Sequence, residues 1–267
     1  MAVDPEFVIG IGSQRAGTTL LHRVLHECSS VFMHPVKELH YFDTLYNVRD
    51  ARVLVEFSRK QIQHAAVPPR NKREECFLRT NKMLASENVR DIDYLDLYRP
   101  CVLGHPQLGE ITPEYMILPE EGVKYMAETI GAGSRIILIT RDPVDRFISA
   151  FKLLKAYNTV NPDFSNFENE ILDVFSGMPG WVEQQKLLNN YELSRNKFSK
   201  YFSNTLEISY EELTSSPGST LRKVEELVGH TLDNKKIDKL FSKRVNEFST
   251  TVGLKESARK LVEKELV

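Results

Sequence analysis

Hydrophobic positions along the chain form two kinds of pattern. Short unbroken apolar runs that end at a glycine or a polar residue are typical of buried strands, and they occur at residues 7–11, 108–111, 135–140 and 205–208. Apolar residues spaced three or four apart predict helices over 18–27, 50–64, 86–98, 119–130, 143–156, 167–175, 181–202, 219–228, 234–245 and 255–267, with polar loops over 67–75 and 157–166. This alternation predicts an α/β fold, a three-layer sandwich with a central parallel sheet flanked by helices.

Composition narrows the class of protein. The chain has 267 residues without repeats or a low-complexity linker, so we expect a single domain over 1–267. A net charge of −2 with 41% hydrophobic residues is typical of a soluble globular protein and does not favour nucleic acid or an acidic membrane as partner. No signal peptide or membrane-spanning stretch is evident. Three cysteines without a CxxC pair predict free thiols, and we expect a cytoplasmic protein without a metal site.

The segment GSQRAGTT, residues 12–19, lies between the first predicted strand and the first predicted helix. It follows the phosphate-loop pattern G-x-x-x-x-G-K-[ST] except that Thr18 stands in the place of the lysine. Backbone amides near Gly12 and Gly17 and the positive end of the helix can bind a phosphate, although a tight turn without ligand is the alternative. Because the missing lysine holds β- and γ-phosphates in nucleoside triphosphatases, its absence favours a ligand with one phosphate in the loop, beside Arg15.

A second motif is TRDPVDRFISAF, residues 140–151, which follows the most apolar strand. Arg141 lies at the carboxyl end of that strand, where open α/β sheets bind ligands, and Ser149 lies two turns into the next helix. The two side chains can hold a phosphate between them, with the arginine acting as a fork. The alternative for Arg141 is an ion pair with Asp142 or Asp145. Together the two motifs predict a P-loop-like fold that binds a nucleotide with two separated phosphates.

These motifs resemble those of a known family. GSQRAGTTLLHRVL resembles the 5′-phosphosulfate loop of the sulfotransferases that use 3′-phosphoadenosine-5′-phosphosulfate (PAPS), and ILITRDPVDRFISAF is similar to their 3′-phosphate motif. KELHYF (37–42), GEITPEY (109–115) and LEISYEEL (206–213) resemble further motifs of the bacterial members and of the related glycosaminoglycan branch, such as the heparan sulfate enzymes. The resemblance covers about residues 7–229 and implies in-line sulfuryl transfer, without a metal, to a hydroxyl or amine of a small-molecule or carbohydrate acceptor.

The resemblance also implies roles for single residues. Glu38 matches the glutamate proposed as general base, with His40 as the alternative base; otherwise Glu38 is a helix-cap carboxylate paired with Lys37. Arg15 would neutralise the leaving phosphate, at a position that is arginine in the tyrosylprotein and several bacterial branches. Glu38, Glu110 and Tyr115 are the expected acceptor contacts, and Glu110 could instead orient the base. The expected donor contacts are Ser13, Gln14, Arg15, Ala16, Gly17, Thr18, Thr19, Arg141 and Ser149.

The sequence departs from the family pattern at Ile111, where relatives carry a lysine that touches the donor sulfate. Either Arg15 must then also act on the donor sulfate, or a lysine from elsewhere in the chain must replace the family lysine. Two other functions stay open: a P-loop kinase without its lysine, which would need magnesium and ATP, and a non-catalytic nucleotide-binding protein, which Ile111 favours. The basic residues of the C-terminal segment, Arg244, Lys255 and Arg259, could close over the donor.

Overall fold

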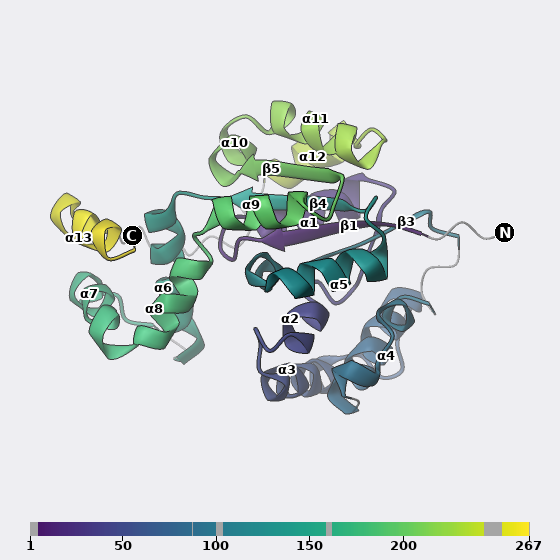
Figure 1. Ribbon diagram of the computed structural model, residues 1–267, viewed down its shortest axis with the longest axis horizontal. Helices are drawn as coiled ribbons and strands as arrows, with labels where there is room; N and C mark the ends of the chain where they lie inside the picture. Colours follow the sequence, from purple (N-terminus) through teal and green to yellow (C-terminus); the bar gives the residue numbers. More distant parts are fainter. Residues whose placement is uncertain (1–4, 87, 100–103, 159–161, 243–252, 267) are drawn as a thin grey trace.

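A five-stranded parallel sheet forms the centre of the protein in the computed structural model (Figure 1). The structure describes residues 5–86, 88–99, 104–158, 162–242 and 253–266. The strand order is β2-β3-β1-β4-β5. The strands are β1 (Glu6–Gly12), β2 (Phe32–Met33), β3 (Gln107–Ile111), β4 (Arg135–Thr140) and β5 (Asn204–Ser209). The four predicted strands are confirmed, and β2 has only two residues, too few to give a sequence signal.

Helices cover both faces of the sheet, which confirms the three-layer α/β fold. Successive side chains of β1 enter different cores, because Phe7 and Ile9 pack on one face and Val8 packs on the other. In Figure 1, α11 and α12 lie above the sheet, and α5 and α2 lie below it. The bounds of the helices on these faces are α1 (Thr18–Cys28), α2 (Tyr41–Leu45), α5 (Glu120–Ile130), α9 (Tyr191–Ser199), α10 (Tyr210–Ser215), α11 (Pro217–Val228) and α12 (Asn234–Phe241).

Two further groups of helices extend the sandwich. At one end of the sheet, α6 (Pro143–Asn158), α7 (Phe167–Gly177), α8 (Pro179–Leu187) and α13 (Glu256–Leu266) surround a third apolar cluster (Figure 1). Trp181 packs against Phe147 in this cluster, with 5.3 Å between ring centroids, so it belongs to the core. Beyond α2, the helices α3 (Ala51–His64) and α4 (Lys72–Ser86) lie side by side.

The helix predicted over 86–98 is wrong. The regular helix is α4, which begins inside the predicted polar loop and ends at Ser86. The following residues form two short 3-10 turns, η1 (Val89–Asp91) and η2 (Tyr94–Leu97). A side chain caps the start of each turn, because Asn88 accepts a hydrogen bond from the Arg90 amide and Asp93 accepts one from the Leu95 amide.

The helix predicted over 181–202 is divided into α8 and α9. The break lies at residues 188–190, where the side chain of Asn190 accepts a hydrogen bond from the Leu193 amide and begins α9. This break has a function in the fold, because the backbone oxygen of Leu188 accepts a hydrogen bond from Ser13 in the phosphate loop. The corner between α8 and α9 therefore supports the loop.

Two of the three cysteines lie among the described residues. Cys28 is a buried free thiol, whereas Cys76 is in a disulfide, so the expectation of free thiols is wrong for Cys76. Cys101, like Arg244 of the C-terminal segment, lies outside the described residues. Among the helices that the structure describes, none has the length and apolar character needed to cross a bilayer.

Candidate active site at the carboxyl edge of the sheet

Three loops meet at one edge of the sheet because they follow neighbouring parallel strands. Strand β1 pairs with β3 on one side and with β4 on the other. The loop 12–19 follows β1, residues 112–115 follow β3, and Arg141 follows β4. The carboxyl ends of parallel strands lie at the same edge, and this edge is where open α/β sheets place their ligand sites.

The phosphate loop is shaped around Gly17. This residue has a φ of 91° and precedes α1, and a Cβ atom there would lie 2.8 Å from the ring of Tyr210. No side chain caps the start of α1, so its first amides remain available to an anion. Of the predicted donor contacts in the loop, Ser13, Ala16 and Thr18 are buried, while Gln14, Arg15 and Thr19 are partly exposed.

Arg15 and Arg141 bring the two predicted phosphate motifs together. Arg15 Nε donates a hydrogen bond of 2.9 Å to Ser149 Oγ, and Arg141 Nη1 donates one of 2.8 Å to the backbone oxygen of Arg15. The Arg141 guanidinium lies over the ring of Tyr210, 4.5 Å from its centroid. Burial, followed by the charge of Arg141, lowers the pKa of Arg15. Two neighbouring guanidinium groups in a half-buried place favour the binding of an anion between them.

Arg141 does not pair with the neighbouring aspartates. Arg259 of α13 occupies both, with its Nη2 at 2.7 Å from Asp142 Oδ1 and its Nη1 at 2.5 Å from Asp145 Oδ1. The Nε atom of Arg141 is buried and has no hydrogen-bond partner among the described residues. This donor is therefore available to a ligand.

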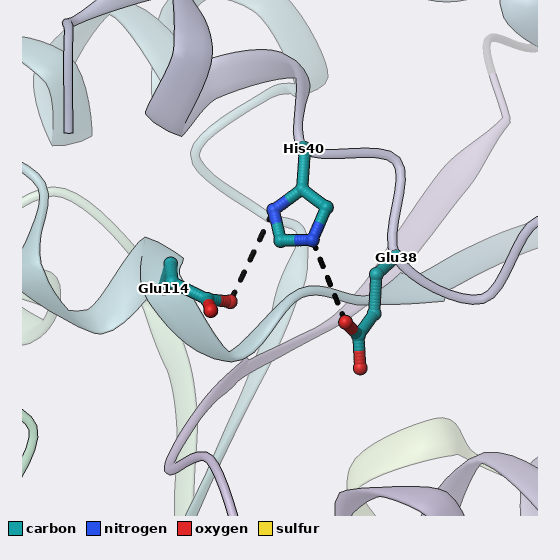
Figure 2. A group of neighbouring side chains, drawn as sticks. All are labelled: Glu38, His40 and Glu114. Carbon is teal, nitrogen blue, oxygen red and sulfur yellow. Dashed lines mark ion pairs between the residues drawn. The ribbon is translucent and has the colours of Figure 1, made fainter. Parts of the chain in front are cut away.

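A cluster of three carboxylates surrounds His40, and Figure 2 shows two of them, those of Glu38 and Glu114. His40 Nδ1 lies 2.7 Å from Asp43 Oδ2 and 3.9 Å from Glu114 Oε2, and His40 Nε2 lies 3.4 Å from Glu38 Oε2. Burial opposes the charge on the ring, but the carboxylates outweigh it and raise the pKa of His40 to about 10. Burial likewise opposes ionisation of Glu38, but Lys37 and His40 lower its pKa below the ordinary value. At neutral pH the cluster therefore contains an imidazolium and an ionised Glu38.

The sequence and the fold both resemble those of known proteins. A sequence model of the Sulfotransferase family matches residues 5–234. The chain belongs to this family. The structure of a sulfotransferase from Alicyclobacillus acidocaldarius is similar to this one, with a TM-score of 0.62 at 16% identity. The aligned region covers 99% of this chain and 92% of that protein. The sulfotransferase STF9 from Mycobacterium avium has a TM-score of 0.53 at 16% identity, and the aligned region covers 99% of this chain and 76% of STF9. At these identities the likeness supports the fold. No curated protein matches the sequence.

Glu110 of this sulfotransferase positions the Glu38–His40 loop from inside the core. Its Oε2 atom accepts hydrogen bonds from the Leu39 amide at 3.0 Å and from Thr112 Oγ1 at 2.7 Å. Its Oε1 atom accepts from the hydroxyls of Tyr94 and Tyr115, both at 2.8 Å. Glu110 and Tyr115 are fully buried, and this geometry favours a role in orienting the base over the expected contact with the acceptor.

One group of described residues could in principle hold a metal ion in this sulfotransferase. Glu38, His40 and Glu114 each offer a ligand atom, and these atoms lie within 4.8 Å of one another. Figure 2 shows, however, that the ring lies between the two carboxylates, with Glu38 facing one ring nitrogen and Glu114 facing the other. A single ring nitrogen cannot share one ion with both, so the arrangement favours a network of ion pairs over a metal centre.

The sequence analysis missed several residues of the sulfotransferase site. Asp43 lies three positions after His40, a spacing that places two residues on the same side of a helical turn, and this signal could have found it. Glu114 lies within the recognised segment 109–115 but was not assigned a role. Its Oε1 atom accepts a hydrogen bond of 3.5 Å from Gln14, which connects the carboxylate cluster to the phosphate loop. Tyr210 reaches Arg141 from the start of α10, and no local pattern could predict that contact.

Proposed function

We propose that this sulfotransferase moves the sulfuryl group of PAPS directly, in line, to a hydroxyl or amine of a small-molecule or carbohydrate acceptor. The observation that carries the proposal is the contact between the two phosphate motifs. Ser149 accepts from Arg15, and Arg15 in turn accepts from Arg141, although 126 residues separate the two arginines. The 5′ and 3′ phosphates of one nucleotide need two cationic subsites side by side.

The residues present fit this donor. Arg141 has a buried Nε donor without a partner among the described residues, and no side chain caps the first amides of α1, which follow Gly17. Residues 13–19 would hold the 5′-phosphosulfate, and Arg141 and Ser149 would hold the 3′-phosphate. When bound, PAPS supplies the sulfuryl group on a good leaving phosphate. Arg15 then faces the charge that develops on that phosphate, and its role is electrostatic because a guanidinium hardly releases a proton.

Glu38 is the proton acceptor in this proposal. Its side chain is 36% exposed, so an acceptor can reach it, and its lowered pKa keeps it ionised at neutral pH. As the acceptor oxygen or nitrogen bonds to sulfur and the bond from sulfur to the leaving phosphate breaks, the acceptor proton passes to Glu38. His40 is disfavoured as the base because its raised pKa keeps it protonated. It instead holds the carboxylate of Glu38 in place.

Lys37 offers a cation close to the position of the missing family lysine. Ile111 is fully buried and offers no charge. Its amide donates a hydrogen bond of 3.1 Å to the backbone oxygen of Lys37, whose ammonium group contacts Glu38. The lysine side chain therefore starts beside Ile111. This placement supports an active enzyme over a protein that only binds the nucleotide.

Calorimetric titration tests the donor. We expect the wild-type protein to bind 3′-phosphoadenosine-5′-phosphate (PAP) without a metal and more tightly than ATP with magnesium. Substitution of Arg141→Ala should weaken PAP binding by about tenfold or more, because a charge-assisted pair of hydrogen bonds is lost. A preference for magnesium-ATP, or no binding of PAP, would contradict the proposal. PAP binding with no sulfate transfer from PAPS to any hydroxyl or amine acceptor would leave only the nucleotide-binding function.

A further inference from the structure

Helix α13 brings one charged side chain to the start of α6. The guanidinium of Arg259 spans Asp142 and Asp145, with one nitrogen on each carboxylate. Apolar residues of the same helix hold it in place, because Ala258 and Val262 are buried and Val262 belongs to the cluster around α6 and α7. The family match ends at residue 234, so α13 lies outside the part of the chain that matches the family.

The two aspartates are next to the predicted 3′-phosphate subsite. Asp142 directly follows Arg141 and immediately precedes α6, and Asp145 lies in the first turn of that helix. Glu211 adds a third carboxylate, since it accepts a hydrogen bond of 3.1 Å from the Asp142 amide. Without a cation of their own, Asp142 and Asp145 would compete for Arg141 and would repel a phosphate.

Arg259 removes this competition. With both aspartates paired to Arg259, Arg141 is directed to the backbone oxygen of Arg15 and to the ring of Tyr210. We propose that Arg259 is a positioning residue for the donor: it neutralises Asp142 and Asp145 and so keeps Arg141 available to the 3′-phosphate. The proposal rests on the proposed function, and it assigns α13 to donor binding without direct contact between Arg259 and the nucleotide.

A purely structural role for Arg259 would give a different result in a rescue experiment. Substitution of Asp142→Asn together with Asp145→Asn removes the charges that Arg259 neutralises. The start of α6 should survive this change, because Asp142 Oδ1 accepts the Asp145 amide at 2.8 Å and asparagine caps helices as well as aspartate does. Loss of Arg259 should therefore harm donor binding only while the aspartates are charged.

The test is PAP titration of the full-length protein and four variants at low and high salt. Arg259→Gln should weaken PAP binding about three- to tenfold at low salt and less at high salt. The triple variant D142N/D145N/R259Q should bind within about twofold of D142N/D145N. Lys260→Gln is the matched control, because Lys260 pairs only with Glu256 on the outer surface of α13 among the described residues.

The outcomes separate the two proposals. If wild type does not bind PAP, the proposed function fails. If wild type binds and Arg259→Gln binds equally well, the role of Arg259 is overturned while the function stands. If the triple variant is as weak as Arg259→Gln, the contact is only structural and the inference is also overturned. If Arg259→Gln does not fold, PAP titration of D142N/D145N/R259Q and of D142N/D145N still tests the proposal. Unequal PAP affinities of these two variants would contradict it.

Discussion

At the scale of single residues, Glu110 organises the loop of the proposed base through three consecutive amides. Glu110 accepts a hydrogen bond directly from the Leu39 amide. Thr112 donates to Glu110 and accepts from the His40 amide at 3.5 Å. Tyr115 likewise donates to Glu110 and accepts from the Tyr41 amide at 3.1 Å. Burial raises the pKa of Glu110, although four donors act in the opposite direction. The position of Glu38 therefore depends on a carboxylate that solvent does not reach.

Substitution of Glu110→Gln should disturb this arrangement. The NH2 group of glutamine would place a donor where Glu110 has an acceptor. It would face either the Leu39 amide and the Thr112 hydroxyl or the hydroxyls of Tyr94 and Tyr115. We expect the free energy of unfolding to fall by about 1–3 kcal/mol and turnover to fall more than PAP affinity. Denaturant titration and steady-state kinetics measure the two effects. Glu120→Gln, which changes an exposed partner of Lys200, is the control. Unchanged stability and turnover in Glu110→Gln would contradict the role.

The sequence located the two phosphate motifs but not the contacts that each residue makes. Arg141 and Ser149 were expected to hold one phosphate between them, and in the structure each of them contacts Arg15, because the loops that follow β1 and β4 lie side by side. Glu110 and Tyr115 were expected at the acceptor and are buried instead. All five residues of β3 are buried, since both faces of the sheet are covered. A motif alone cannot show which of its polar residues points into the core.

At the scale of elements, the junction of β1 and α1 determines the shape of the proposed donor site. The chain must turn through a left-handed conformation at Gly17, and β5 with the start of α10 delivers Tyr210 against it. The same ring also lies against Arg141. One aromatic side chain thus fixes both the loop and the arginine of the second motif.

Substitution of Gly17→Ala should damage this junction. A φ of 91° is unfavourable for alanine, and its methyl group would lie 2.8 Å from Tyr210. We expect a loss of about 1–2 kcal/mol in stability, with weaker PAP binding because Tyr210 must move. Gly133→Ala is the matched control, since a Cβ there meets nothing within 4 Å. Thermal unfolding and PAP titration of both variants provide the measurement, and equal behaviour would refute the argument.

Strands and amphipathic helices could be predicted because burial leaves a periodic pattern. The errors occur where polar side chains bond to the backbone and end a helix locally. Asn88 and Asp93 divide one predicted helix into short turns, and Asn190 separates α8 from α9. Apolar periodicity continues across these breaks, so the pattern alone favours one long helix.

At the scale of the whole molecule, ion pairs inside the site couple global stability to pH. His40 is almost fully buried between Asp43, Glu38 and Glu114, and its pKa is raised to about 10 from an ordinary value near 6.5. A raised pKa in the folded state stabilises the protein fully below about pH 6.5. This stabilisation is lost as the pH rises toward 10, because the folded protein must then release the proton.

The variant His40→Gln should therefore be least stable relative to wild type near pH 6. We expect the difference in the free energy of unfolding between the two proteins to shrink by up to about 1.4 kcal/mol per pH unit as the pH rises toward 10. Denaturant unfolding of both proteins from pH 6 to 10 measures it. His64→Gln at the exposed end of α3 is the control. A difference that is constant with pH would show that His40 is not protonated in the folded state.

The division of the site among chain segments has a consequence for recombination between homologues. Residues assigned to the donor come before position 20 and after position 140, whereas the carboxylate cluster and Glu110 all come from one uninterrupted stretch, residues 37–115. That stretch begins after β2 and ends just after β3, and both of these strands lie on the same side of β1 in the sheet. A homologue could therefore exchange it as a cassette and acquire a new acceptor while inheriting the donor machinery intact.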